Sequence, residues 1–166
     1  MADSARDATE ILADDHKAFL ALVGSIEGEP HPAGRRELAD TLIAEIMRHA
    51  VAEEMFVYPA IRAHVPDGAE QVRLDKAEHQ EMVEAMKVME DVDASDPRFM
   101  ASLGRLRELL VEHASSEEGE QFPRLRAHVP AEELREMGAK VEAAKALAPT
   151  RPHPMAPHSA LFHKLV

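Results

Sequence analysis

The chain has 166 residues and a mass of 18.3 kDa, which suits a single domain large enough to bury a core. It contains no cysteine, so disulfides, thiolate metal sites and cysteine nucleophiles are excluded. A formal net charge of −12 without a basic cluster argues against nucleic acid as a partner, and no apolar stretch approaches the length of a membrane span.

Abundant Ala, Leu, Glu, Met and Val, with only 4% aromatic residues, favour helices over sheets. A first helix is predicted from Ser4 or Asp7 to about Glu27, before a loop rich in proline and glycine. A second begins near Arg35. Pro59 lies inside that second helix and is predicted to kink it, because proline removes one backbone donor and clashes with the preceding turn.

The third helix is expected to begin after Asp67 as N-cap, with Glu70 three residues later as in a capping box. Pro97 is expected at the first position of the fourth helix, and Pro123 should repeat the kink of the second. A methionine stripe on the third helix is interpreted as core. Its members are Met82, Met86 and Met89.

A shorter helix is predicted from Ala131 to about Leu147, and residues 148–166 are expected to form an extended, proline-rich tail. Four long helices with short connections predict an all-α, up-down-up-down four-helix bundle over residues 1–147, which includes the shorter helix.

Residues 49–66 and 113–130 form an internal repeat with a constant offset of 64 positions, and they share the same histidines, glutamates and prolines at equivalent places. Each repeat opens on His-x-x-x-Glu, and the helix before each one carries a single histidine on its apolar face. This pattern predicts two similar helical hairpins packed about a pseudo-two-fold axis. The candidate metal ligands are His16, His49, Glu53, His79, His113 and Glu117.

Residues four apart lie on the same helix face, so both His-x-x-x-Glu pairs should point into the core. Burying four imidazoles and two carboxylates without a cation would be very costly. Imidazole and carboxylate without thiolate suit iron, manganese or zinc, and six ligands exceed the four of a structural zinc site. We therefore expect two metal ions, each with two histidines, bridged by Glu53 and Glu117.

In chain order, the candidate set is His16, His49-x-x-x-Glu53, His79 and His113-x-x-x-Glu117, one group on each of four helices. That order resembles the hemerythrin-like (HHE cation-binding) domains over about residues 10–130. The resemblance implies a left-turning four-helix bundle and two iron ions (Fe²⁺/Fe³⁺) with an oxo or hydroxo bridge. It also implies binding of oxygen or related small ligands; manganese and zinc are the alternative metals.

The chain departs from the oxygen-carrying hemerythrins at two places. Their third helix has a second histidine four residues after the first, where this chain has Val83. Their fourth helix has a carboxylate five residues after its histidine, which is Glu118 here; the internal repeat favours Glu117 and leaves Glu118 as an alternative. Asp75, one turn before His79, is a candidate additional ligand.

The set of four histidines and two glutamates also resembles that of di-iron proteins that repair iron centres, although this chain lacks their cysteine-containing N-terminal segment. Glu45 and Glu78 correspond to acidic residues near the site in those proteins, and a solvated helix face is the alternative explanation for both. Tyr58 is expected either to hydrogen-bond near the site or only to pack.

These features predict a non-haem di-iron protein that binds or senses oxygen, nitric oxide or peroxide. The alternatives are a peroxide-consuming enzyme of catalase or peroxidase type, iron delivery for repair of damaged iron centres, and an interaction module with a vestigial site. The N-terminus lacks a basic region followed by an apolar run, so a cytoplasmic location is expected.

Overall fold

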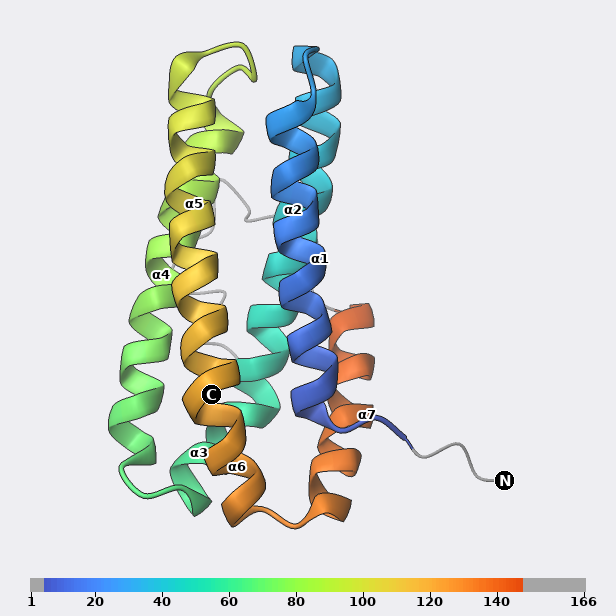
Figure 1. Ribbon diagram of the computed structural model, residues 1–166, viewed down its shortest axis with the longest axis vertical. Helices are drawn as coiled ribbons and strands as arrows, with labels where there is room; N and C mark the ends of the chain where they lie inside the picture. Colours follow the sequence, from blue (N-terminus) through green and yellow to red (C-terminus); the bar gives the residue numbers. More distant parts are fainter. Residues whose placement is uncertain (1–4, 148–166) are drawn as a thin grey trace.

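The computed structural model describes residues 5–147, so the predicted tail lies outside the described residues. The long helices stand side by side, and each is antiparallel to the one before it (Figure 1). They are α1 (Ala8–Gly28), α2 (Pro32–Ala52), α4 (Gly68–Asp91) and α5 (Pro97–Ser116). The predicted all-α, up-down-up-down bundle is confirmed, and residues 5–147 contain no β-strand. None of the described helices combines the length and apolarity needed to cross a bilayer.

In each hairpin, the second helix is interrupted by a five-residue π-helical turn. The segments that follow α2 are η1 (Glu53–Val57) and α3 (Tyr58–His64), and those that follow α5 are η2 (Glu117–Gln121) and α6 (Phe122–His128). In each π-turn the N–H donates to a carbonyl five residues back, from Tyr58 to Glu53 and from Phe122 to Glu117. Pro59 and Pro123 lie just after these turns. Each helix is therefore interrupted by a π-turn before its proline, where the sequence predicted a kink at the proline itself.

Of the four long helices, α1 and α5 begin at the capping residues predicted from the sequence. The Asp7 carboxylate accepts a hydrogen bond of 3.1 Å from the Glu10 N–H, which fixes the start of α1 at Ala8. Asp96 likewise accepts from the Arg98 N–H at 2.8 Å, with Pro97 as the first residue of α5. The second helix begins at Pro32, three residues before the predicted start.

The predicted capping box at the start of α4 is wrong. Asp67 does precede the helix, but its φ of 59° is left-handed and its side chain makes no capping hydrogen bond. The chain turns tightly here, with the Gly68 N–H donating to the Val65 carbonyl at 3.0 Å. Glu70 instead accepts from the Arg73 guanidinium on the surface at 2.6 Å.

The last described α-helix, α7 (Ala131–Leu147), packs beside α1 and α2, as Figure 1 shows. Its approach is close: a Cβ on Gly138 would lie only 2.4 Å from the Arg6 carbonyl oxygen. The predicted boundaries of this helix are confirmed.

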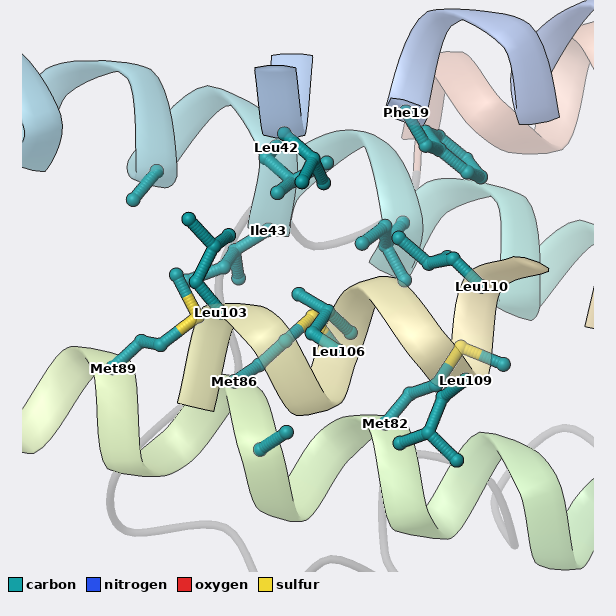
Figure 2. Close-up of a cluster of buried hydrophobic side chains, with 14 of the residues drawn as sticks. Phe19, Leu42, Ile43, Met82, Met86, Met89, Leu103, Leu106, Leu109 and Leu110 are labelled. Carbon is teal, nitrogen blue, oxygen red and sulfur yellow. The ribbon is translucent and has the colours of Figure 1, made fainter. Parts of the chain in front are cut away.

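Two apolar clusters fill the bundle, and a polar layer separates them. One cluster joins α1, α2, α4 and α5 toward the end of the bundle remote from α3 and α6. Figure 2 shows part of it, including the methionine stripe of α4, whose side chains are at most 2% exposed as expected. The second cluster joins the start of α1 to α3, α6 and α7. Along each long helix, the candidate ligands lie between residues of the two clusters.

Candidate metal centre

The structure brings all six candidate ligands into one buried layer. Each of the six side chains is at most 3% exposed. The four histidines come one from each long helix, and their rings lie close together. The centroid separations are 5.0 Å for His16–His49, 5.1 Å for His79–His113 and 5.6 Å for His16–His113.

Their donor atoms form two overlapping groups. His16, His49, His113 and Glu117 each offer one atom within 4.8 Å of the others, and so do Glu53, His79 and His113. Glu53 occupies the middle of the layer. Its Oε1 lies 2.5 Å from His49 Nε2, 3.7 Å from His79 Nε2 and 3.6 Å from His113 Nε2.

Each imidazole has a carboxylate on its outer nitrogen. These Nδ1 contacts are His16–Glu118 at 3.0 Å, His49–Asp15 at 2.9 Å and His113–Glu78 at 3.0 Å, with Glu54 at 3.6 Å from His79. For His16, His49 and His113, a carboxylate at Nδ1 fixes the ring orientation and leaves Nε2 facing the centre. This arrangement is the usual support of metal-binding histidines. In His79 the Glu54 oxygen lies beyond hydrogen-bond distance of Nδ1, and Nε2 meets the Tyr58 hydroxyl.

The inner atoms of the layer lie close to one another, as His49 Nε2 does to Glu53 Oε1, but they form no hydrogen bonds of regular geometry. This holds for both carboxylate oxygens of Glu53 and of Glu117, and for Nε2 of His16, His49 and His113, all of them buried. A buried polar atom without a partner costs about 1–3 kcal/mol, so such atoms are rare and seldom adjacent. Nitrogen and oxygen donors that converge in this way fit a cation.

A family model described as "Hemerythrin HHE cation binding domain" matches residues 7–125. The chain belongs to the hemerythrin HHE cation-binding domain family. Its resemblance to a crystal structure of an HHE cation-binding domain-containing protein from Mycobacterium kansasii supports this, with a TM-score of 0.75, 25% identity and 86% of each chain covered. The fold and the family inferred from the order of the histidines are therefore confirmed.

Two curated proteins are similar in sequence to this HHE domain. An uncharacterized hemerythrin-like protein of Schizosaccharomyces pombe is 34% identical over 119 residues, which are 71% of this chain and 59% of that protein. A DNA nickase of Nostoc is 24% identical over 136 residues, 82% of this chain and 38% of that enzyme. The chain thus matches about half of the length of these relatives.

The sequence analysis did not identify Asp15 and Glu54, two of the four outer carboxylates of this HHE domain. Glu118, an alternative ligand by sequence, lies instead on the outer nitrogen of His16. Glu78 contacts His113, whereas Glu45 pairs with Arg48 at 3.0 Å, away from the layer. The signal that was available is an acidic neighbour in sequence beside a candidate ligand. It occurs at Asp15-His16, Glu53-Glu54, Glu78-His79 and Glu117-Glu118.

Two further polar residues lie beside the layer. Tyr58 is fully buried, and its hydroxyl lies 3.0 Å from His79 Nε2, so it hydrogen-bonds at the site rather than only packing. Asp75 is fully buried too, but it belongs to neither donor group. Its Oδ1 accepts from Gln71 at 3.0 Å and from Gln121 at 2.9 Å.

Opposite charges within the layer set the protonation of the metal-free HHE domain. Burial lowers the pKa of His49, but the carboxylates of Glu53 and Asp15 outweigh it and raise that pKa to about 9. Burial opposes ionisation of Glu53, yet the contacting histidines hold its pKa well below the usual range. For Glu117, burial and the charge of Glu53 raise the pKa to about 7. Burial and the charge of His49 lower the pKa of His16 to about 3.

Proposed function

We propose that this HHE domain holds two iron ions in its polar layer and binds a small ligand there, namely oxygen, nitric oxide or peroxide. The observation that carries the proposal is the convergence of unpartnered imidazole nitrogens and carboxylate oxygens in a buried layer. Six nitrogen and oxygen donors match iron better than a four-ligand structural zinc site. Iron, when bound, would supply open coordination positions and a change of oxidation state.

The donor positions support a division of roles among the six side chains. Glu53 Oε1 lies within 3.7 Å of Nε2 of three histidines, which suits a bridging carboxylate. Glu117 begins the equivalent π-turn of the second hairpin and joins the other donor group, which suits the second bridge. The outer carboxylates hold the imidazole rings so that their Nε2 atoms face inward.

A small apolar cavity beside the layer supports a ligand of diatomic size. Its volume of about 10 Å³ gives room for a single small molecule. His79 is its one polar lining residue, and the others are Ile46, Met47, Ala50, Met82, Val83 and Met86. Val83 stands where the oxygen-carrying hemerythrins have their extra histidine. An apolar wall here favours oxygen or nitric oxide over a charged ligand.

Metal analysis of aerobically purified protein tests the proposal. We expect about two iron ions per chain, with absorption from oxo-to-iron charge transfer. The double variant Glu53→Gln/Glu117→Gln should keep its helical circular dichroism and lose the iron. Glu45→Gln is the matched control, because Glu45 pairs with Arg48 outside the layer. Colourless, iron-free protein from iron-replete cells would overturn the proposal.

The Tyr58 hydroxyl favours peroxide dismutation as a second candidate function. This phenol is buried against His79, and burial together with the charge of Glu53 raises its pKa well above 10, so it stays a proton donor. The second hairpin has Phe122 at the equivalent position, so Tyr58→Phe should be tolerated by the fold. Oxygen evolution from peroxide that falls in Tyr58→Phe, with iron content unchanged, would support turnover. Equal rates in both proteins would contradict a role for the phenol.

A further inference from the structure

The C-terminal helix α7 lies beyond residues 7–125, which the family model matches, yet it reaches the polar layer. Lys145 of α7 extends its Nζ to 2.6 Å from Asp15 Oδ1. The other oxygen of that carboxylate, Oδ2, lies 2.9 Å from His49 Nδ1. His49 Nε2 in turn faces Glu53 Oε1 at 2.5 Å. An unbroken line of polar contacts therefore runs from α7 to the centre of the site.

The Lys145–Asp15 pair differs from the ion pairs on the surface of the molecule. Its side chains are only 17% and 14% exposed, compared with 67% and 60% for the surface pair Arg73–Glu70. Exposed pairs contribute little, because solvent screens them and their side chains stay mobile. A mostly buried pair is held in one geometry, and loss of the cation would leave a buried carboxylate oxygen without its partner.

The internal repeat shows that this contact belongs to one half of the site alone. Asp15 on His49 corresponds to Glu78 on His113 in the second hairpin. Glu78 is 34% exposed, and within residues 5–147 no lysine or arginine is paired with it. Helix α7 has no counterpart in the repeat, so it adds a positive charge behind His49 only.

We propose that Lys145 is a positioning residue of the metal centre, acting through Asp15 on His49. Its ammonium holds one oxygen of Asp15, so that the other keeps His49 oriented with Nε2 toward Glu53. The same charge draws electron density from the carboxylate and weakens its pull on the His49 N–H, which makes His49 a poorer donor than His113. The inference rests on the proposed function, because it assigns a role toward the metal held there.

Metal affinity and reduction potential of Lys145→Met, beside wild type, test this role. Loss of an outer partner of a metal-binding histidine typically lowers metal affinity 10- to 100-fold, and we expect at least about tenfold weaker iron(II) binding in chelator competition. The midpoint potential of loaded Lys145→Met should shift downward, because removal of a nearby positive charge favours the oxidised metal. A purely structural contribution would not lower the potential in this direction.

Three further variants make the outcome decisive. Lys140→Met changes an exposed lysine of the same helix and should leave both quantities unchanged, whereas Lys145→Arg keeps the charge and should largely restore them. Asp15→Asn combined with Lys145→Met should be no worse than Asp15→Asn alone, since both act through one carboxylate. Additive effects, or an unshifted potential in folded Lys145→Met, would overturn the inference. Failure of wild type to bind iron would overturn the proposed function instead.

Discussion

Each imidazole of the polar layer has two nitrogens with different neighbours. The outer nitrogen meets a carboxylate and the inner nitrogen faces other candidate ligands, as His113 does with Glu78 outside and Glu117 inside. The two outer carboxylates of each hairpin correspond between the repeats. The pairs are Asp15 with Glu78, and Glu54 with Glu118. The symmetry of the sequence therefore extends beyond the candidate ligands to the carboxylates that contact them.

Helical spacing predicted the six inner side chains but few of the outer ones. A residue next to a ligand points about 100° away around the helix, which reads as a solvent-facing position. Asp15 and Glu118 are turned instead toward neighbouring helices, so their partners depend on packing between helices. The long-range contacts Asp15–His49 and His16–Glu118 could not be inferred from periodicity along one helix.

Asp75→Asn is expected to stabilise the metal-free protein at neutral pH. Burial raises the pKa of Asp75 from its ordinary value of 3.8 to about 6, despite the hydrogen bonds from Gln121 and Gln71. The stability contributed by its proton is fully present below about pH 4 and is lost as pH rises through 6. At pH 7 the substitution should therefore add about 1–3 kcal/mol to the free energy of unfolding.

Urea denaturation of metal-free wild type and Asp75→Asn at pH 4 and pH 7 measures this difference. The gain should be present at pH 7 and small near pH 4, where wild-type Asp75 is protonated in the folded state and about half protonated in the unfolded state. A gain of the same size at both pH values would show that the cost of the buried charge is not its cause.

At the scale of elements, the π-turns explain how consecutive glutamates come to be buried. Glu53 and Glu54 are 0% and 3% exposed although they are adjacent, and Glu53 opens the turn. Pro59 in the sequence predicted an interruption of the helix. Its form could not be predicted, because a kink and a π-turn both accommodate the missing proline donor. Packing of the bundle selects the π-turn, which leaves Glu53 in the layer and brings Tyr58 to His79.

The docking of α7 is expected to be sensitive to a single methyl group. In Gly138→Ala the new Cβ would meet the Arg6 carbonyl oxygen at 2.4 Å and the Ala8 nitrogen at 3.1 Å, and both belong to backbone. We expect a loss of about 1–3 kcal/mol in unfolding free energy, the usual cost of overpacking. Gly104→Ala, in the middle of α5 with nothing within 4 Å of its Cβ, should instead add up to about 1 kcal/mol.

Chemical denaturation of both alanine variants checks the opposite signs. Both variants gain the higher helix propensity of alanine, but only Gly138→Ala disturbs the close approach of α7. The difference between their unfolding free energies therefore measures the cost of that disturbance. Stabilisation by Gly138→Ala would show that α7 does not dock against the chain before α1.

At the scale of the whole molecule, the polar layer lies between two apolar clusters and joins all four long helices. The internal repeat was enough to predict the two hairpins, because each repeat carries the same helical pattern and the same ligand pair. The position of α7 beside α1 and α2 was not predictable, because its apolar residues indicate a buried face without specifying the surface that covers it.

Removal of metal is expected to lower the melting temperature of the whole bundle. A cation that binds only the folded state at a concentration 100-fold above its Kd stabilises it by about 2.7 kcal/mol. For a chain of this length that corresponds to roughly 5–10 °C. Calorimetry of iron-loaded and chelator-treated protein measures the difference, and His113→Ala should show none. Equal melting temperatures for loaded and chelated wild type would contradict the expected linkage.

The protonation of His49 and His113 in the metal-free protein also bears on how the site would take up a cation. Burial lowers the pKa of both imidazoles, but the glutamates beside them outweigh it: they raise the pKa of His49 to about 9 and hold that of His113 well above its usual value, which favours the protonated rings. An incoming cation can use their inner nitrogens only after those protons leave. A cation that binds in this layer would therefore release protons as it enters, and a fall in pH would weaken its binding.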